Sequence, residues 1–422
     1  MRIWLVNHYA SDPSNSASGS RHYSLARRLH QLGWEPTIIA ASVEHNSSRQ
    51  RLEPDVKLRD TINGGVSFRW LRTRAYTGNG IARILNMIEF TTALLRRSST
   101  KDLVPPDIIL GSTVHPLAAW AASRLARRHG VPFVFEIRDL WPQTLIDMGK
   151  LSQKGLPARF MRQLERHLTA KAVKVITLLP YAAEYLETIG VDPNKVVWIS
   201  NGTNTDEFDV RPHSPSDIFT FLYFGSLGHA NGLPAILEGY AQLVERRPQA
   251  KTRLVFVGNG PEKTNLQQLQ KELGLGERVQ FIPAVPKNDI PGIAATADCL
   301  VLNLLDLKIY RYGISLNKLF DYMAASRPIV IASNSRNNPV RDSGGGVCVA
   351  GDDPYAITDG LLKVLEASRE ERNQWAQSAV EYVSEHFDYT VLGEQLDSVL
   401  REALGTYPAD SEPPSGSRRE GI

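Results

Sequence analysis

The residues of this chain that are best placed for chemistry lie in one stretch, SLNKLFDYMAASRPIVIA, at residues 315–332. A helix is predicted there, beginning near Ser315, where Ser315 or a neighbour would cap it. The N-terminus of a helix favours anions, and Lys318 lies in the first turn. Asp321 follows three residues later on the same face. This pair suits a ligand with phosphate at one end and a hydroxylated ring near the other, such as a nucleotide sugar.

An isolated K-x-x-D pattern is usually an exposed pair on a solvated helix face, and that remains the alternative. The whole stretch, however, resembles the donor-binding segment of retaining glycosyltransferases of family four, which have the GT-B fold. In that family a P-S-K-x-x-E-Y-M-A-x-G-x-P-V-like string binds the diphosphate and the ribose. Asn317 precedes the lysine here, Asp321 replaces the usual glutamate and Ser326 replaces the usual glycine. The resemblance implies that Lys318 acts on the diphosphate and Asp321 on the ribose hydroxyls.

Length and composition are those of a two-domain globular protein, with 422 residues, 42% hydrophobic and 22% charged. A formal net charge of +3 is too small to indicate nucleic-acid binding. Cys299 and Cys348 lie in apolar, strand-like runs, so neither a disulfide framework nor a metal cluster is predicted. We expect no signal peptide in MRIWLVNHYA and no membrane-spanning run, hence a cytoplasmic protein.

The first half of the chain opens with a βαβ pattern. Strands are predicted at Ile3 to Val6 and Thr37 to Ala41, on either side of the helical segment RHYSLARRLHQLG. A doubly wound sheet binds ligands at the carboxyl ends of its strands. The loop before the helix contains Gly19, where the family usually has a glycine pair, and Gly19 would let the backbone approach a donor closely.

Residues Ile81 to Leu95 form a second predicted helix, with an apolar face that comprises Ile81, Ile84, Leu85, Ile88 and Leu95. Arginines flank it. The helix could contact a membrane surface or a lipid-linked acceptor. The preferred alternative is a half-buried helix of the domain core.

The predicted strand Pro132 to Ile137 delivers Glu136, Arg138 and Asp139 to its carboxyl end. EIRDLWP resembles a subgroup of family four in which Arg-Asp takes the place of His-Asp. The resemblance implies that Arg138 contacts the transferred sugar, with Asp139 as its orienter or as the partner of a sugar hydroxyl. A purely structural Arg138–Asp139 arrangement is the alternative. His115, a lone histidine at a strand end, is a weaker candidate.

The segment SNGTNTDEF at residues 200–208 resembles the family's N-G-V-D-x-x-x-F string, at which the first domain hands over to the second. The resemblance implies donor contacts at three successive loops of the second domain. These are Gly225 and Ser226, then Gly258, then Ala284 and Val285, whose backbone would read the base. Ser226 and Asn231 stand where the family often has an arginine and a lysine for the diphosphate.

The family also carries two glutamates eight residues apart in this region. Asp321 matches the second, and Gly313 stands where the first would be. We therefore expect backbone amides between Gly313 and Leu316, including that of Ser315, to contact the sugar or the phosphates.

The predicted fold class is α/β, with two Rossmann-like doubly wound domains that face a central cleft. The acceptor-side domain is expected at 1–205, the nucleotide-sugar domain at 206–388 and a helix crossing back to the first domain at 389–404. Residues 405–422 are expected to be disordered.

The resemblance implies a retaining transfer of an N-acetylated hexose from a UDP-linked donor to a lipid-linked or cell-envelope glycan acceptor. No cofactor, metal or firm enzyme nucleophile is implied, and the catalytic residues would be Arg138, Asp139 and Lys318. A nucleotide-sugar epimerase is one alternative, but only Asp139, Glu136 and His115 could serve it as acids and bases. The other alternative is a noncatalytic binding subunit, which the missing basic residues at Ser226 and Asn231 favour.

Overall fold

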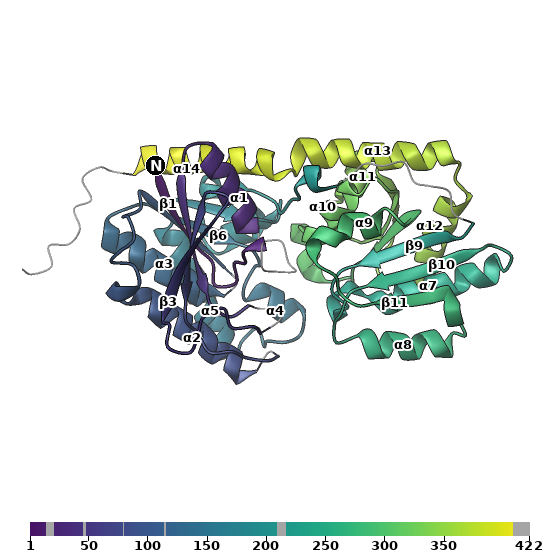
Figure 1. Ribbon diagram of the computed structural model, residues 1–422, viewed down its shortest axis with the longest axis horizontal. Helices are drawn as coiled ribbons and strands as arrows, with labels where there is room; N and C mark the ends of the chain where they lie inside the picture. Colours follow the sequence, from purple (N-terminus) through teal and green to yellow (C-terminus); the bar gives the residue numbers. More distant parts are fainter. Residues whose placement is uncertain (14–20, 45–47, 79, 114, 209–216, 408–422) are drawn as a thin grey trace, which may run out of the picture. The chain divides into compact units, whose positions relative to one another are not determined.

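The computed structural model of this chain describes residues 1–13, 21–44, 48–78, 80–113, 115–208 and 217–407 (Figure 1). These residues form two compact units. The first unit is Met1–Ser200 together with Leu392–Ile422, and the second is Asn201–Val391. Each unit is built around its own β-sheet. Gly19 lies outside the described residues, as does the segment from residue 408 onward.

The first unit contains an eight-stranded sheet with the strand order β3-β4-β2-β1-β5-β6-β7-β8. All neighbouring strands are parallel except β3 and β4, which pair antiparallel. The parallel central strands are apolar and buried, because helices cover such a sheet on both faces. The strands are β1 (Arg2–Val6), β2 (Glu35–Ala41), β3 (Leu58–Asn63), β4 (Val66–Leu71), β5 (Ile108–Ser112), β6 (Phe133–Ile137), β7 (Lys174–Thr177) and β8 (Val196–Trp198).

The helices of this unit include the one predicted from Ile81 to Leu95, which has those bounds. The helix is half-buried, as the preferred alternative expected, but the side chains that it buries are not those of the listed apolar face. Phe90 and Leu94 are buried beside the polar Asn86, whereas Ile81 is 75% exposed and Ile88 43% exposed. The α-helices are α1 (Arg21–Gln31), α2 (Ile81–Leu95), α3 (Pro116–His129), α4 (Gln143–Asp147), α5 (Leu156–Lys171) and α6 (Ala182–Thr188).

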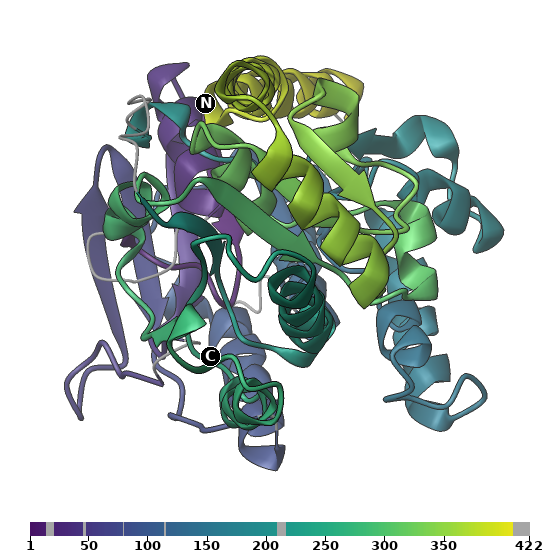
Figure 2. The ribbon, with the colours of Figure 1, turned by 90° about the vertical axis from the view of Figure 1, so that its right-hand side faces the viewer.

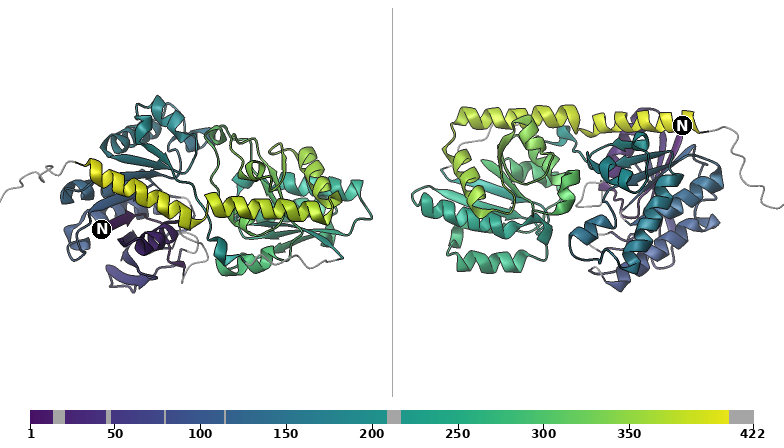
Figure 3. Two further views of the ribbon diagram at one scale, coloured as in Figure 1. Left: turned by 90° about the horizontal axis from the view of Figure 1, so that it is seen from above. Right: turned by 180° about the vertical axis from the view of Figure 1, so that it is seen from behind.

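The last helix, α14 (Tyr389–Thr406), begins in the second unit and continues from Leu392 as part of the first. Its later turns lie along the first unit (Figure 3). Trp34 Nε1 donates to Asp397 Oδ1 at 2.6 Å, and Lys174 Nζ lies 2.6 Å from Glu402 Oε1. The first unit is therefore assembled from two separate stretches of the chain.

The second unit contains a six-stranded parallel sheet with the strand order β11-β10-β9-β12-β13-β14. Its strands are β9 (Phe219–Phe224), β10 (Thr252–Val257), β11 (Val279–Ile282), β12 (Cys299–Asn303), β13 (Ile329–Ala332) and β14 (Gly346–Val349). Its α-helices are α7 (Leu233–Arg246), α8 (Lys263–Glu272), α9 (Ile290–Ala294), α10 (Asn317–Ala324), α11 (Pro339–Ser343), α12 (Pro354–Glu366) and α13 (Arg369–His386). Helix α12 packs against α7 and the β13–β14 end of the sheet (Figure 2).

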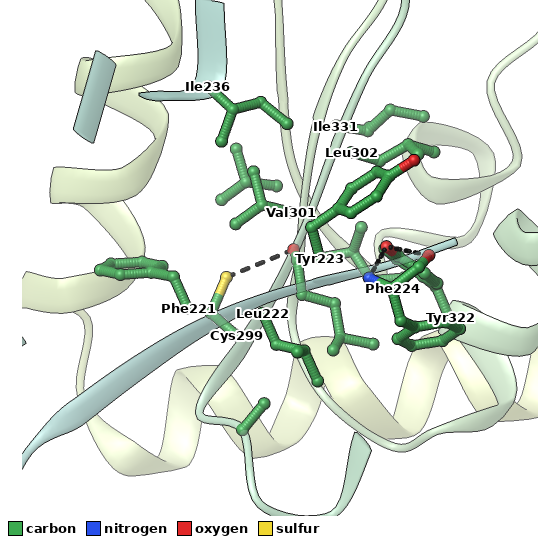
Figure 4. Close-up of a cluster of buried hydrophobic side chains, with 14 of the residues drawn as sticks. Phe221, Leu222, Tyr223, Phe224, Ile236, Cys299, Val301, Leu302, Tyr322 and Ile331 are labelled. Atoms are coloured by element: carbon green, nitrogen blue, oxygen red, sulfur yellow. Dashed lines mark hydrogen bonds between the residues drawn. The ribbon is translucent and has the colours of Figure 1, made fainter. Parts of the chain in front are cut away.

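The core of the second unit brings helix α10 onto strand β9 (Figure 4). The buried Tyr322 hydroxyl accepts a hydrogen bond from Phe224 N at 2.8 Å and donates to Phe224 O at 3.0 Å. Both bonds satisfy a polar group that would otherwise be costly to bury. They fix α10 to the last residue of β9, immediately before the loop that begins at Gly225. Cys299, which is buried, and Cys348 form no disulfide bond with each other.

Candidate functional site

Helix α10 begins at Asn317 and is preceded by Leu316 as its N-cap residue, without a side-chain cap. The expected cap residue, Ser315 or a neighbour, is thus the neighbour Leu316, which has no polar side chain to donate or accept a cap hydrogen bond. Asn201 instead holds the loop before the helix: its backbone N–H donates to Ser315 Oγ at 2.8 Å, and its side chain donates to Ser315 O at 2.6 Å. Lys318 is in the first turn, as predicted.

The ammonium group of Lys318 is held by two neutral partners. Nζ lies 2.9 Å from Tyr223 Oη and 2.6 Å from Asn231 Oδ1, and 4.7 Å from the centre of the Tyr223 ring. In the part of the chain that the structure describes, no carboxylate lies within ion-pair distance of Nζ. Removal from water lowers the pKa of Lys318 to about 7. A cation that is poorly hydrated and unpaired by any acid favours an arriving anion.

Ser226 and Asn231, which stand where the family often has an arginine and a lysine, also take part in the hydrogen bonds around Lys318. Tyr223 Oη donates to Ser226 O at 2.7 Å, and Asn231 Nδ2 donates to the same oxygen at 2.8 Å. The two residues thus join Tyr223 and Lys318 in a closed ring of hydrogen bonds. Asn231 supplies an acceptor to Lys318 where a lysine would place a second ammonium group.

Glycines allow the two neighbouring loops at the ends of β9 and β10 to touch. Gly225 has φ +141° and Gly258 has φ +152°, values that side chains rarely permit. A Cβ atom at Gly258 would lie 1.9 Å from the carbonyl oxygen of Gly225. Both predicted donor loops therefore require glycine at these positions.

The loop from Gly313 to Leu316 already uses two of the amides that were expected to serve the ligand. Gly313 N donates to Tyr310 O at 3.0 Å, and Ile314 N donates to Asn337 Oδ1 at 2.7 Å. These two amides are therefore unavailable without a rearrangement, which is a correction to the expectation for Gly313. Ser315 and Leu316 follow in the same loop and stay candidates.

The carboxylate of Asp321 makes two contacts that the sequence did not predict. Thr203 Oγ1 donates to Oδ1 at 2.6 Å, while Lys287 Nζ lies 3.2 Å from Oδ1 and 3.4 Å from Oδ2. Asp321 is buried, and Lys318 is not its partner. Thr203 belongs to the SNGTNTDEF segment, whereas nothing in the spacing around Lys287 indicated a site. Ala284 and Val285 lie in the loop directly before Lys287.

In the first unit, Arg138 and Asp139 follow the end of β6. Arg138 N donates to Thr113 Oγ1 at 3.0 Å. Within the described ranges the side chains of Arg138 and Asp139 form no ion pair with each other, so Asp139 is not seen to orient Arg138. Both the orienting role of Asp139 and the structural Arg138–Asp139 arrangement stay predictions. Asp139 is exposed, and the Trp141–Pro142 peptide bond is cis.

Glu136 points into a buried network instead of standing ready as an acid or base. Its carboxylate accepts hydrogen bonds from Arg21 Nε at 2.9 Å and Ser112 Oγ at 2.6 Å, and it lies 2.7 Å from His22 Nε2. Burial opposes ionisation, but His22 and Arg21 hold the pKa of Glu136 well below its ordinary value. Arg21 also donates to the carbonyl of Ile199 at 2.8 Å. Glu136 is therefore a structural carboxylate.

His115 is also withdrawn from acid–base work. Its Nε2 lies 2.6 Å from Nδ1 of His8, and burial lowers the pKa of His115 to about 3. The side chain is thus neutral at physiological pH. Of the three residues counted for an epimerase, only Asp139 remains accessible.

Neither a metal site nor a membrane span is found in the described residues. They contain no group of three or more His, Cys, Asp or Glu side chains that could hold a metal ion. None of their helices is long and apolar enough to cross a bilayer.

Two family models match the chain in succession: a glycosyl transferase 4-like domain at residues 17–202, and glycosyl transferases group 1 at residues 204–382. A curated relative is the D-inositol 3-phosphate glycosyltransferase of Corynebacterium diphtheriae, 26% identical over 303 residues. That match covers 70% of this chain and 66% of the relative, just under two thirds of its length.

Solved structures match almost the whole chain. The sucrose-phosphate synthase of Thermosynechococcus elongatus has a TM-score of 0.73 at 17% identity, covering 96% of this chain and 99% of that one. An Anabaena protein in complex with UDP and glucose has a TM-score of 0.66 at 15% identity, covering 95% and 99%. At these identities the likeness establishes the arrangement of the backbone.

Proposed function

Because this chain belongs to the GT-B glycosyltransferases of the GT4/group 1 family, we propose that it transfers a hexose from a UDP-linked donor with retention at the anomeric carbon. The predicted fold of two Rossmann-like doubly wound domains is confirmed, and the chain is an enzyme of the hexosyltransferase type. The sugar that we propose is N-acetylated.

The observation that carries the proposal is the state of Lys318. It lies in the first turn of α10, is held by Tyr223 and Asn231, and has no carboxylate partner among the residues of described placement. A diphosphate that reached Nζ would gain a charge-assisted hydrogen bond without first breaking an ion pair. The touching glycine loops at Gly225 and Gly258 offer backbone close to the same lysine, since a Cβ at Gly225 would lie 3.1 Å from Lys318 Cδ.

The proposed chemistry uses positioning and charge. The bond between the anomeric carbon and the diphosphate oxygen breaks while the acceptor hydroxyl forms its bond on the same face, and the leaving phosphate takes the acceptor proton. Lys318 offsets the negative charge that develops on the leaving group. Asp321 binds the ribose hydroxyls, the backbone at Ala284 and Val285 takes the base, and Arg138 with Asp139 contacts the transferred sugar. Gly19, Ser226, Ser315 and Leu316 complete the proposed set.

For the acceptor we propose a lipid-linked or cell-envelope glycan, reached by the enzyme at the cytoplasmic face of the membrane. The support is helix α2, on which Ile81 is 75% exposed, Ile84 54%, Leu85 38% and Ile88 43%. Exposed isoleucines at this spacing, with Arg96 and Arg97 at the end of the helix, fit an interfacial helix. The Corynebacterium relative is named for D-inositol 3-phosphate, a phosphorylated polyol, which is the competing acceptor class.

Calorimetric titration with UDP, GDP and ADP tests the donor half of the proposal. We expect UDP to bind, and Lys318→Ala and Asp321→Ala each to weaken it by about tenfold, which is ~1.4 kcal/mol. Binding of GDP or ADP in place of UDP would correct the nucleotide. Failure of all three to bind would sink the proposed function.

Sedimentation with vesicles tests the acceptor half. Wild-type protein should sediment with vesicles that contain acidic phospholipid, and the double substitution Ile84→Ser, Ile88→Ser should release it. Because both side chains are exposed, the variant should keep its unfolding temperature and its affinity for UDP. Failure of the wild type to sediment would argue for a water-soluble acceptor, and equal sedimentation of both proteins would show that α2 is not the contact.

A further inference from the structure

An ion pair joins the two parts of the second unit that are proposed to read the nucleoside. Lys287 begins the short 3-10 helix η7 (Lys287–Asp289), just after the loop that contains Ala284 and Val285. Its Nζ reaches both oxygens of Asp321 on helix α10, at 3.2 Å and 3.4 Å. The proposed base loop and the proposed ribose carboxylate are thus in direct contact, although they are 34 residues apart in the chain.

The pair is partly withdrawn from water, which makes it stronger than a surface salt bridge. The side chain of Lys287 is 23% exposed and that of Asp321 is 11% exposed. Burial opposes the charge on Lys287, but Asp321, Tyr389 and Glu207 together raise the pKa of the ammonium group above its ordinary value. Lys287 is therefore charged over the whole physiological range.

Asp321 is fixed from its other side by Thr203, whose hydroxyl donates to Oδ1 at 2.6 Å. The backbone of Thr203 is hydrogen-bonded on both sides: its N–H donates to Phe387 O at 3.1 Å and its carbonyl accepts from Tyr389 N at 3.0 Å. Among the residues whose placement is described, Oδ1 therefore has two donors, whereas Oδ2 faces Lys287 alone, at the longer distance. An ionised carboxylate has about four acceptor sites, so Oδ2 retains capacity for ligand hydroxyls.

We propose that Lys287 is a specificity-determining residue of the donor site, which couples the base loop to Asp321 so that the site distinguishes ribonucleotides from 2′-deoxyribonucleotides. The inference rests on the proposed function, since it takes the ligand to be a nucleotide donor. With the pair intact, the carboxylate is held in one direction and pre-organised for vicinal hydroxyls. Without Lys287, Asp321 can follow the ligand or turn away, and the base loop moves independently of it.

Position 321 carries an aspartate, which is shorter than the glutamate usual in the resembling family. A glutamate at position 321, as in the resembling family, would extend one methylene further from the helix. Asp321 instead lies where Thr203 and Lys287 hold it. The aspartate side chain is shorter, and two donors, Thr203 and Lys287, hold its carboxylate in place. Lys287 follows the base loop.

The test compares UDP with 2′-deoxy-UDP by calorimetry. Wild-type protein should prefer UDP by about tenfold or more, the worth of one charge-assisted hydrogen bond. Lys287→Met should reduce this preference to about threefold or less, mainly by weakening UDP. Lys287→Arg, which keeps the charge, should retain most of the preference. Lys271→Met, which removes one exposed charge from helix α8, serves as the matched control and should change neither affinity.

Two results would overturn the inference while the proposed function stands. One is an unchanged preference in Lys287→Met. The other is an equal weakening of both nucleotides with the ratio intact, which would show that Lys287 only supports the fold. Loss of folding in Lys287→Met would be detected from its thermal unfolding, and Lys287→Arg would then decide: preference retained supports the inference, and preference lost overturns it. Failure of the wild type to bind any nucleotide would overturn the proposed function itself.

Discussion

The side-chain oxygen of Asn231 lies 2.6 Å from the ammonium nitrogen of Lys318. A neutral amide therefore occupies the place beside this lysine where an acid would neutralise it and a base would repel it. The charge of Lys318 is therefore set by the pH and by burial, and its consequences can be measured.

Affinity for nucleoside diphosphate should fall as the pH rises above about 7, the pKa to which burial lowers Lys318. The neutral amine lacks the charge that attracts the diphosphate, so the affinity should fall towards that of Lys318→Ala, about tenfold weaker, and then level off once Lys318 is deprotonated. Calorimetry of UDP binding across this range measures it. Lys318→Arg keeps its charge and should remove this pH dependence, which distinguishes the titration of Lys318 from that of the nucleotide. An equal slope in both proteins would show that Lys318 is not the titrating group.

The same lowered pKa affects stability with a defined sign. The native state binds fewer protons than the unfolded chain between about pH 7 and 10.5, the ordinary pKa of a lysine side chain. The free energy of unfolding that depends on Lys318 should therefore rise with pH in this window, because burying the ammonium group opposes folding below it. Lys318→Met should flatten the rise in urea denaturation.

Asn231→Asp should pair Lys318 and weaken nucleotide binding. The substitution keeps the size and places a carboxylate against the ammonium group at the distance now occupied by the amide oxygen. The ion pair should raise the pKa of Lys318 and increase stability, while the affinity for UDP falls by about tenfold or more because the diphosphate must now displace an acid. Asn231→Ala, which removes the contact without adding charge, should weaken UDP less than Asn231→Asp.

Ser326→Gly should stabilise the protein. Ser326 has φ +54°, in the left-handed region at the end of helix α10, and it replaces the usual glycine of the resembling family. Relief of this strain should add about 1 kcal/mol to the free energy of unfolding. The adjacent Ala325, with φ −73°, provides the matched control. Ala325→Gly should lower stability by about 1 kcal/mol, so an equal effect of both substitutions would contradict the explanation.

Substitution by glutamine should have very different effects on stability at two buried glutamates of the first unit. Glu136→Gln leaves Arg21 buried without its counter-charge and should cost about 3–5 kcal/mol. Burial raises the pKa of Glu165 to about 8 despite the hydrogen bond from Tyr185 and the nearby arginines, so this group is protonated at neutral pH. Glu165→Gln should therefore change stability little at pH 7.

The pH dependence of the second substitution provides a further check. Glu165 binds its proton more tightly in the native state, so its contribution to stability is lost as the pH rises from about 4.5 to 8. Glu165→Gln should remove this loss. Urea denaturation at several pH values measures both variants, and a large penalty for Glu165→Gln at pH 7 would show that the carboxyl is ionised.

Local patterns predicted the elements that carry the site. The alternation of apolar strands with helices was sufficient for the parallel sheets, and helical spacing placed Lys318 in a first turn. Strand β3 was missed because LRDTIN is polar and only partly buried, with antiparallel pairing to β4 alone. The Asn63–Gly64–Gly65 turn between β3 and β4, with φ +53° and +80° at its glycines, was the signal that could have found it.

Tertiary contacts account for the rest. Periodicity found helix α2 but could not tell which side of it is buried: the buried side includes Asn86, whose amide donates to Arg74 O at 2.6 Å. The pairing of Lys287 with Asp321 depends on how a loop folds back across 34 residues. The withdrawal of Glu136 depends on Arg21 and His22, more than 110 residues earlier. Spacing along the sequence does not predict contacts between residues so far apart in the chain.

Helix α14 imposes an order on the synthesis of this protein. The second unit is a continuous stretch, Asn201–Val391, and is complete when its last residue leaves the ribosome. The first unit is translated earlier but has to wait for the turns that begin at Leu392, which carry the partners of Trp34 and Lys174. The half of the protein that is made first is therefore finished last, and a nascent chain that stalls before Leu392 exposes the surface of the first unit that this helix covers.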